Sequence, residues 1–319
     1  MRNNYAIGLA DIQAAAERIR GVAQRTPIMT CATLDRMAGR SLFFKCEQFQ
    51  KVGAFKFRGA CNAVRKLSDA DAKKGVVTHS SGNHAQALAL AAKLRGIAAH
   101  IVMPSSATPV KRRAVEGYGA KVIECEPTLI AREVTVAEVQ KKTGAILIPP
   151  YNHPDIIAGQ GTVALEMLAD LPDLDAIVAP IGGGGLMAGV TLAAKALKPS
   201  VRLFAAEPLG ADDAARSKAR GELVPQTGPN TIADGLLTSM GDLTWPVVRD
   251  LVEGVITVRE DEIVQAMRLA WERAKMLIEP SSAVAVAAVL SPAFQSITGI
   301  NRVGIVLSGG NVNLDRLPW

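Results

Sequence analysis

The stretch Gly53-Ala54-Phe55-Lys56-Phe57-Arg58-Gly59-Ala60 guides the interpretation of the whole sequence. Its Lys56 stands between two phenylalanines. A lysine with apolar neighbours is either a surface charge on an apolar stem or an amine held in a dry site. In a dry site, desolvation lowers the pKa of the amine, and such a lysine is a nucleophile that forms Schiff bases with carbonyl compounds. That second alternative requires an anion cradle and substrate-binding donors elsewhere in the chain.

A glycine run in the second half of the chain supplies the cradle. The run follows an apolar strand and precedes a helix that we expect to begin near Leu186, and its members are Gly182, Gly183, Gly184 and Gly185. Glycines let several backbone amides point at one anion, and the helix start adds partial positive charge. A dinucleotide loop or a tight turn would use the same residues. Beside Lys56, we interpret the run as the phosphate site of a pyridoxal phosphate cofactor.

Short apolar strands alternate with helices along most of the sequence. Strands are expected at 76–78, 99–103, 121–125 and 145–148, and a second series at 176–180, 201–206 and 303–307. This alternation predicts an α/β fold of two lobes, each a mostly parallel open sheet flanked by helices. We expect residues 75–150 to form a small lobe and residues 1–74 and 151–319 a large cofactor-binding lobe. Ligands bind at the carboxyl ends of such strands, where Ser80, Gly182 and Ser308 fall.

The motifs occur in an order that resembles one family. The segment around Lys56 is followed by Ser80-Ser81-Gly82-Asn83-His84, Ile157 to Thr162, Gly182 to Gly185, Glu207-Pro208 and Ser308 to Val312. This series is similar to the fold type II, or tryptophan synthase β-like, enzymes that use pyridoxal phosphate, within the serine/threonine dehydratase family. It most resembles the serine racemase and 3-hydroxyaspartate dehydratase group. The chain departs from the usual pattern at Ala54, where serine is common, and at Val52, where threonine is common.

The resemblance implies roles for individual residues. Lys56 and Ser81 are expected to be catalytic, because an amine on one face of the cofactor and a hydroxyl on the other could each move a proton at the substrate Cα. The residues expected to bind the cofactor are Phe55, Lys56, Asn83, Gly182, Gly183, Gly184, Gly185, Leu186 and Ser308. The residues expected to bind the substrate are Ser80, Ser81, Asn83, His84 and Arg132.

Arg132 has two interpretations. It is either a surface charge on a helix or a cation near the substrate. In the second case its planar fork would suit a second carboxylate and favour 3-hydroxyaspartate over serine or threonine.

The loop after Glu207 resembles a divalent-cation site. Glu207, the carbonyl of Ala211 and the Asp213 carboxylate would be oxygen ligands that suit Mg²⁺, with Ca²⁺ or Mn²⁺ as alternatives. An acidic loop facing solvent is the other explanation.

The expected reaction is elimination of water from a 3-hydroxy amino acid, giving a keto acid and ammonia. The candidate substrates are 3-hydroxyaspartate, serine and threonine. Serine racemisation as the main activity, or β-replacement of the cysteine synthase kind, are alternatives on the same fold. A third alternative is a non-catalytic nucleotide-binding protein that uses Gly182 to Gly185.

Composition excludes several classes of protein. In 319 residues, 49% are hydrophobic and 21% charged, which fits a folded globular enzyme rather than a disordered chain. The net charge is +6, but the basic groups are scattered and aromatic residues are few, so we expect no nucleic-acid partner.

The uncharged run 176–194 is long enough for a membrane span, yet Pro180 and the glycines interrupt it. A buried strand, turn and helix is the better interpretation. Four cysteines without CxxC spacing and no signal-like apolar start suggest a cytoplasmic protein. The resemblance also implies a homodimer.

Overall fold

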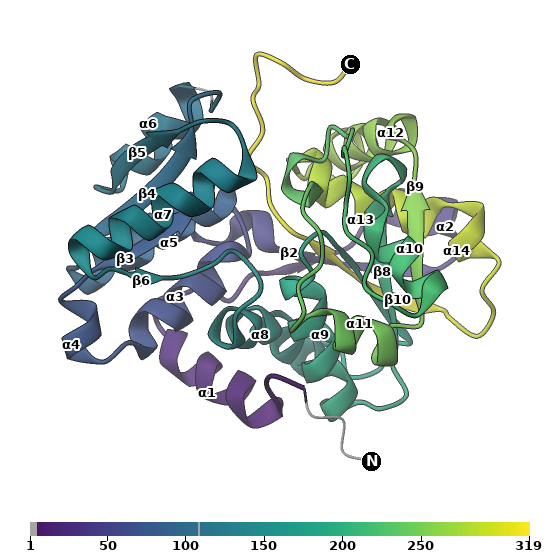
Figure 1. Ribbon diagram of the computed structural model, residues 1–319. Helices are drawn as coiled ribbons and strands as arrows, with labels where there is room; N and C mark the ends of the chain where they lie inside the picture. Colours follow the sequence, from purple (N-terminus) through teal and green to yellow (C-terminus); the bar gives the residue numbers. More distant parts are fainter. Residues whose placement is uncertain (1–4, 108) are drawn as a thin grey trace.

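The larger sheet of the molecule is parallel except at one edge. The structure is a computed structural model, described for residues 5–107 and 109–319. Within these residues six strands pair in the order β1-β2-β10-β7-β8-β9, and only β1 runs antiparallel to its neighbour (Figure 1). The strands are β1 (Ile28–Met29), β2 (Ser41–Cys46), β7 (Ala176–Pro180), β8 (Arg202–Pro208), β9 (Gly254–Val258) and β10 (Arg302–Leu307).

A second sheet lies on the other side of the molecule. Among the described residues it has four parallel strands in the order β5-β4-β3-β6 (Figure 1). The strands are β3 (Val76–His79), β4 (Ala99–Pro104), β5 (Lys121–Cys125) and β6 (Ile146–Leu147). Two separate sheets of mostly parallel strands confirm the predicted α/β fold class.

Helices flank both sheets, because parallel strands need crossover connections, which are usually helical (Figure 1). The described α-helices are α1 (Leu9–Ile19), α2 (Ala32–Ala38), α3 (Lys56–Lys66), α4 (Asp69–Ala72), α5 (Asn83–Arg95), α6 (Pro109–Gly117), α7 (Leu129–Thr143), α8 (Pro154–Asp170), α9 (Gly185–Leu197), α10 (Asp213–Arg220), α11 (Trp245–Leu251), α12 (Glu260–Glu272), α13 (Pro280–Leu290) and α14 (Pro292–Gln295). In this part of the chain no helix is long and apolar enough to cross a membrane.

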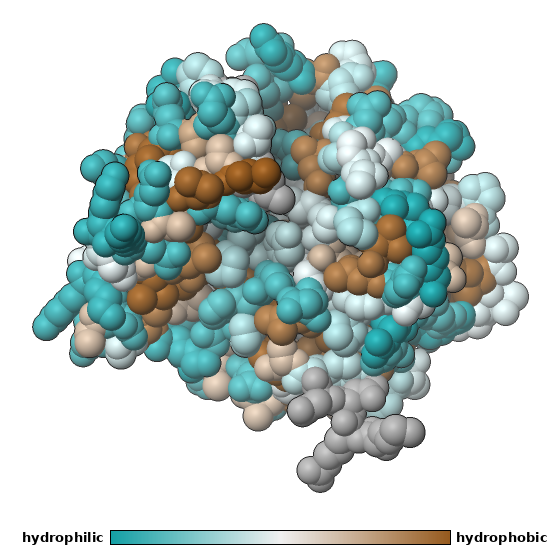
Figure 2. Space-filling view, in the orientation of Figure 1, coloured by the Kyte–Doolittle hydropathy of each residue, from teal (hydrophilic) through white to brown (hydrophobic). Residues whose placement is uncertain are grey.

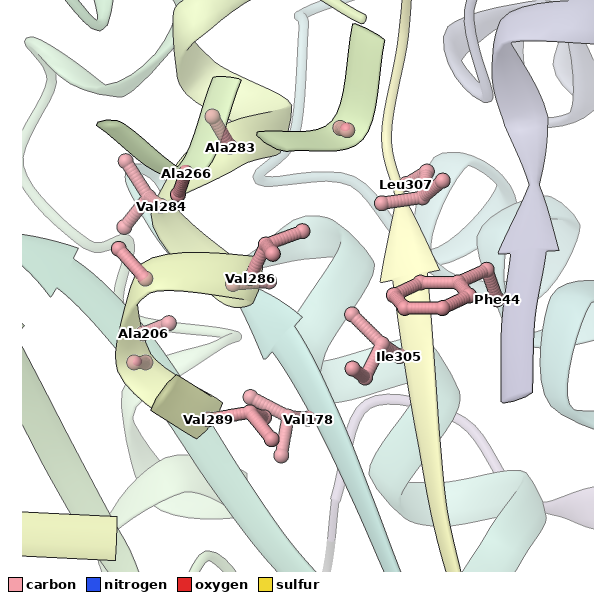
Figure 3. Packing of buried hydrophobic residues seen from close by; sticks show 14 of the residues in the cluster. Phe44, Val178, Ala206, Ala266, Ala283, Val284, Val286, Val289, Ile305 and Leu307 are labelled. Atoms are coloured by element: carbon pink, nitrogen blue, oxygen red, sulfur yellow. The ribbon is translucent and has the colours of Figure 1, made fainter. Parts of the chain in front are cut away.

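Both faces of the six-stranded sheet are buried. On one face α13 packs its valines against alternate side chains of the sheet, as Figure 3 shows for Val286 beside Ile305 and Val289 beside Val178. On the other face α8 and α9 cover Ile177 and its neighbours. Burying one such side chain stabilises the fold by about 1.5–3 kcal/mol. Because both faces are covered, the central strands β7, β8 and β10 are largely apolar runs, which explains why the sequence predicts them.

Two features differ from the sequence-based expectations. Strands β1 and β9, at the two edges of the larger sheet, were not expected. Helix α3 packs in one hydrophobic cluster with the smaller sheet, Phe57 lying in the same cluster as Val76 and Ile101. The contacts of α3 do not test the predicted lobe boundaries at residues 74/75 and 150/151, which stay a prediction.

The carboxyl ends of three central strands supply the expected motifs. Ser80 follows β3, Gly182 follows β7 and Ser308 follows β10. The surface is hollowed between the half with the smaller sheet and the half with the larger one (Figure 2). The chain after β10, yellow in Figure 1, passes between these halves. Segments far apart in sequence thus meet at one place.

Candidate active site

The segment that carries Lys56 is fixed against the turn after β10. Ala54 forms an isolated antiparallel bridge with Gly309, and the N–H of Phe55 donates to the Ser308 carbonyl at 3.0 Å. The N–H of Gly310 donates to the Gly53 carbonyl, also at 3.0 Å. Lys56 is the first residue of α3. Backbone hydrogen bonds alone therefore fix the position of the main chain just before Lys56.

The loop before Lys56 has unusual backbone angles. Val52 adopts a φ of 57°, a left-handed conformation that costs a β-branched residue about 1–3 kcal/mol, and Gly53 follows with a φ of 67°. The side-chain amide of Asn311 donates to the Val52 carbonyl at 2.7 Å. A Cβ at Gly53 would lie 2.8 Å from the Asn311 side chain, so this position requires glycine. The surrounding contacts thus maintain a strained loop next to the lysine.

The amine of Lys56 is held in a desolvated place. Its Nζ donates to the Pro150 carbonyl at 2.8 Å and lies 5.1 Å from the centroid of the Phe55 ring. Burial lowers the pKa of the amine to about 8, against an opposing effect of the Glu279 carboxylate. A lowered pKa makes the neutral, nucleophilic form accessible near physiological pH. Of the two interpretations of Lys56, the structure supports the amine in a dry site.

The glycine run forms a close-fitting loop at the start of α9. Gly184, the N-cap residue, has a φ of 85°, and a Cβ at Gly183 would lie 2.3 Å from the Tyr151 ring. The Thr244 hydroxyl donates to the Gly183 carbonyl at 2.9 Å and so supports the loop from the other side. Leu186 is buried in the first turn of α9. Side chains at these positions would collide with Tyr151 and Thr244, so the loop requires glycines. Its backbone amides at the start of α9 suit an anion such as the phosphate of pyridoxal phosphate.

The turn between β3 and α5 contributes polar groups from the smaller sheet. The Ser80 hydroxyl accepts from the N–H of Gly82 at 3.3 Å, and Ser81 is partly buried. His84 is buried in the first turn of α5, and one of its ring nitrogens, Nε2, lies 2.9 Å from the Ile148 carbonyl. Burial lowers the pKa of His84 to about 3, so its imidazole is neutral at physiological pH. A neutral His84 can bind a substrate but cannot act there as a cationic acid.

Arg132 lies at the carboxyl ends of the smaller sheet's strands. The pKa of His79 is lowered by burial and then by the charge of Arg132, which places the guanidinium near the end of β3. Within the described residues, the buried Nε of Arg132 has no hydrogen-bond partner. This environment differs from that of an arginine on an exposed helix surface.

The predicted metal ligands contain two buried carboxylates. Glu207 accepts hydrogen bonds from the N–H groups of Ala214 and Ala215, each at 2.9 Å, and Asp213 accepts one from Met240 at 3.0 Å. Burial raises the pKa of Glu207 to about 8 and that of Asp213 to about 6. The Oδ1 of Asp213 has no hydrogen-bond partner in the described residues. Ala211, which lies between the two carboxylates in the sequence, is also buried.

No group of three or more His, Cys, Asp and Glu side chains among the described residues could hold a metal. Glu207 and Asp213 supply only two such side chains, and the predicted third ligand is a backbone carbonyl.

One residue of the site was missed by the sequence analysis. Glu279 is 4% exposed, and its carboxylate accepts from the side-chain amide of Asn83 at 2.9 Å. Burial raises its pKa to about 7. The available signal was local: Glu279-Pro280 places one charged residue directly before an otherwise apolar helix. Nothing in the local sequence indicated that Asn83, 196 residues earlier, would be its partner.

Together these residues define the class of the protein: an α/β fold with a desolvated lysine and a glycine loop at strand carboxyl ends. The family described as "Pyridoxal-phosphate dependent enzyme" matches residues 19–309. This chain belongs to that family of pyridoxal-phosphate dependent enzymes.

Individual relatives narrow the comparison. The chain is 55% identical to a serine racemase of Arabidopsis thaliana over 319 residues, covering 99% of this chain and 96% of that protein. The structure of maize serine racemase is similar with a TM-score of 0.97 and 52% identity, covering 98% and 95% of the two chains. Two further structures are 40% identical: a pyridoxal 5'-phosphate-dependent aspartate racemase (TM-score 0.93, covering 99% of both chains) and a threonine deaminase of T.th. (TM-score 0.92, covering 97% and 100%).

The structure brings most of the predicted residues into one neighbourhood. Contacts connect the Lys56 segment with Ser308, Asn83 with the turn after Ser308, and the Pro150-Tyr151 segment with both Lys56 and Gly183. Glu207 and Asp213 are bonded instead around the start of α10. The roles assigned to the individual residues remain predictions.

Proposed function

We propose that this enzyme interconverts the enantiomers of serine and also eliminates water from serine. The observation that carries the proposal is the 55% identity with a serine racemase over nearly the whole of both chains. The sequence analysis favoured elimination, with 3-hydroxyaspartate among its substrates, and gave racemisation as the alternative. The comparisons support the alternative better. Elimination remains part of the proposal because a threonine deaminase has the same fold at 40% identity.

Lys56 and Ser81 are proposed to move the proton at the substrate Cα. Bound pyridoxal phosphate supplies an electron sink that makes this proton acidic. The neutral amine of Lys56 accepts the proton on one face, and a pKa of about 8 suits a base that works near neutral pH. The hydroxyl of Ser81, proposed to lie on the other face, returns a proton from that side. Two proton carriers on opposite faces are the minimum requirement for racemisation.

The turn from Ser80 to His84 is proposed to hold the substrate carboxylate. Its backbone amides stand at the amino end of α5, where the helix dipole favours an anion. Ser308 would face the pyridine nitrogen of the cofactor with a neutral hydroxyl. When the substrate carries a hydroxyl on Cβ, water leaves from it, and hydrolysis of the product releases a keto acid and ammonia. Racemisation and elimination then share the same first proton transfer.

A divalent cation is proposed at Glu207 and Asp213, together with the carbonyl of Ala211. Two buried carboxylates whose pKa values are raised by burial would be stabilised by a bound cation, and the unpartnered Asp213 oxygen offers it a ligand. Because Glu207 and Asp213 are bonded around the start of α10, the cation would support the structure rather than take part in the chemistry. Mg²⁺ is the first choice, with Ca²⁺ and Mn²⁺ as alternatives.

An acidic substrate is a second candidate for the same site. The buried Nε of Arg132, unpartnered within the described residues, is a donor that a second substrate carboxylate could use. An aspartate racemase is also 40% identical over 99% of this chain. On this alternative, aspartate or 3-hydroxyaspartate would react better than serine.

One substrate panel tests both candidates. The full chain with pyridoxal phosphate is incubated with each enantiomer of serine, threonine and aspartate and with the isomers of 3-hydroxyaspartate. The opposite enantiomer and the keto acid are then measured, with Mg²⁺ and with EDTA. We expect D-serine from L-serine together with a keto acid. Faster reaction of aspartate would favour the second candidate, and absence of both products from every substrate would refute the proposal. O-acetylserine with sulfide tests β-replacement in the same format.

A further inference from the structure

Glu279 is a buried acid next to the proposed cofactor site. It precedes α13, its side chain is 4% exposed, and its backbone N–H donates to the Gly309 carbonyl at 3.1 Å. A Cβ at Gly309 would lie 2.9 Å from Glu279 Oε1, so the carboxylate lies directly against the turn that begins with Ser308. A buried carboxylate is costly unless hydrogen bonds compensate it. The groups that donate hydrogen bonds to Glu279 are therefore held in place around it.

Those partners come from two other segments of the chain. The Nδ2 of Asn83 lies 2.9 Å from Oε1 and 3.1 Å from Oε2 of Glu279. The backbone N–H of Asn311 donates to Oε2, also at 3.1 Å. All of these groups are donors, so both carboxyl oxygens of Glu279 act here as acceptors. One carboxylate thus connects the Ser80–His84 turn with the turn after β10.

The second partner of Asn83 completes its orientation. Its Oδ1 accepts from the Nδ2 of Asn311 at 2.8 Å, and that same Nδ2 donates to the Val52 carbonyl at 2.7 Å. Both Glu279 oxygens accept from the Nδ2 of Asn83, and the Asn83 oxygen accepts from Asn311, so the NH₂ end of Asn83 faces Glu279 and its oxygen faces Asn311. The amide is therefore held in one of its two flip states. Two oxygens of one carboxylate can share a single N–H, which leaves the second N–H of Asn83 for another acceptor.

We propose that Glu279 is a positioning residue of the cofactor site, whose carboxylate holds the Asn83 amide so that its second N–H meets the ring oxygen of bound pyridoxal phosphate. The inference rests on the proposed function, because it requires the cofactor to bind beside Asn83. It assigns to Glu279 an effect exerted through Asn83 rather than contact with the substrate. Asn311 orients the same amide from its other end, because it donates a hydrogen bond to the Asn83 oxygen.

Glu279→Gln tests this with almost no change in side-chain volume. The variant replaces one acceptor oxygen with an NH₂ group. This NH₂ group must then face the NH₂ of Asn83 or the N–H of Asn311, and two donors cannot form a hydrogen bond with each other. Glu272→Gln, at the exposed end of α12, removes a charge far from Asn83 and is the matched control. The full chain is stripped of cofactor and titrated with pyridoxal phosphate, and the dissociation constant and the visible absorption band are recorded.

We expect Glu279→Gln to raise the dissociation constant of pyridoxal phosphate about tenfold, the scale of a lost charge-assisted hydrogen bond, and to shift the absorption band. Glu272→Gln should change neither. An unchanged constant and band in Glu279→Gln would overturn the inference. Failure of the unsubstituted chain to bind the cofactor would instead overturn the proposed function, so the two failures are distinguishable.

A double-mutant cycle separates positioning from a general structural effect. In an Asn83→Ala background, Glu279→Gln should no longer change the dissociation constant, because there is no amide left to orient. An equal effect in both backgrounds would mean that Glu279 acts independently of Asn83, against the inference. If Glu279→Gln does not fold, Asn311→Ala still removes the donor to the Asn83 oxygen and should weaken cofactor binding and shift the band. Unchanged cofactor binding together with an unchanged absorption band in Asn311→Ala would count against the inference.

Discussion

The Nζ of Lys56 donates a hydrogen bond of 2.8 Å to the carbonyl oxygen of Pro150. The donor is an amine whose pKa burial lowers to about 8, and the acceptor belongs to the segment that also places Tyr151 against Gly183. A carbonyl can only accept, so the bond forms in either protonation state of the amine, and it leaves the neutral form of Lys56 accessible near pH 8. The contact thus holds the amine against the segment that packs on the glycine loop and leaves its neutral form available.

The reaction of Lys56 with pyridoxal phosphate should therefore depend on pH in a defined range. Only the neutral amine attacks an aldehyde, and with a pKa of about 8 its fraction is about one tenth at pH 7 and one half at pH 8. The rate of cofactor incorporation into the cofactor-free chain should rise from pH 6.5 and level off above pH 9. Stopped-flow absorbance measures this rate. A surface lysine with an ordinary pKa would instead show a rate still rising above pH 10.

Lys56→Ala is the control for that experiment. It should abolish reductive fixation of the cofactor by borohydride and lower both activities by at least about 10³-fold. Peptide mapping of the unsubstituted chain should find the fixed cofactor on Lys56. Fixation on a different lysine would show that the site has been misassigned.

Ser81→Ala should separate racemisation from elimination. Elimination from the enantiomer whose Cα proton faces Lys56 needs no proton carrier on the other side, whereas racemisation does. We expect racemisation to fall by at least about 100-fold and this elimination by less than about tenfold. Chiral chromatography and keto-acid release measure the two rates. The neighbouring Ser80→Ala should lower both rates in the same proportion, and such a parallel decrease for Ser81→Ala would exclude the proposed role.

The sequence predicted the groups of the site better than the connections between them. Lys56, Gly182 to Gly185 and Ser308 could be found because local patterns mark them: aromatic neighbours, a glycine run after an apolar strand, and a serine at a strand end. The partnership of Glu279 with Asn83 could not be found, because it depends on how two distant segments fold together. Strand β9 was missed at the edge of its sheet, where β8 is its single pairing partner among residues 5–107 and 109–319.

Asp213→Asn should remove the response of the protein to Mg²⁺. If the cation binds the folded state alone, a concentration of 100 times its dissociation constant stabilises that state by about 2.7 kcal/mol. The amide of Asn lacks the charge of Asp213, so this stabilisation should largely disappear. Urea unfolding with Mg²⁺ and with EDTA measures it, and Asp261→Asn, an exposed residue of α12, should keep the full response. Equal responses of both variants would argue against a cation at Asp213.

Arg58, two residues after Lys56, anchors α3 through an ion network in which Arg58 and Glu47 are fully buried and Glu166 is partly buried. Its guanidinium bonds to Glu47 at 2.7 and 2.8 Å and to Glu166 of α8 at 2.7 and 2.8 Å. Burial alone would lower the pKa of Arg58, but the two carboxylates outweigh it and raise the pKa. Lys45 of β2 also bonds to Glu166, at 2.6 Å. The network joins the start of α3 to a strand and to a helix of the larger half.

Arg58→Met should therefore destabilise the protein far more than loss of a surface ion pair. The substitution preserves apolar volume but leaves the 0%-exposed Glu47 without its cation, at a cost of about 3–5 kcal/mol in the free energy of unfolding. Arg268→Met breaks an exposed pair with Glu272 on α12 and should cost less than about 1 kcal/mol. Urea unfolding compares the two. Because α3 begins at Lys56, Arg58→Met should also weaken pyridoxal phosphate binding while Arg268→Met does not, and equal stability of the two variants would show that the network does not hold the helix.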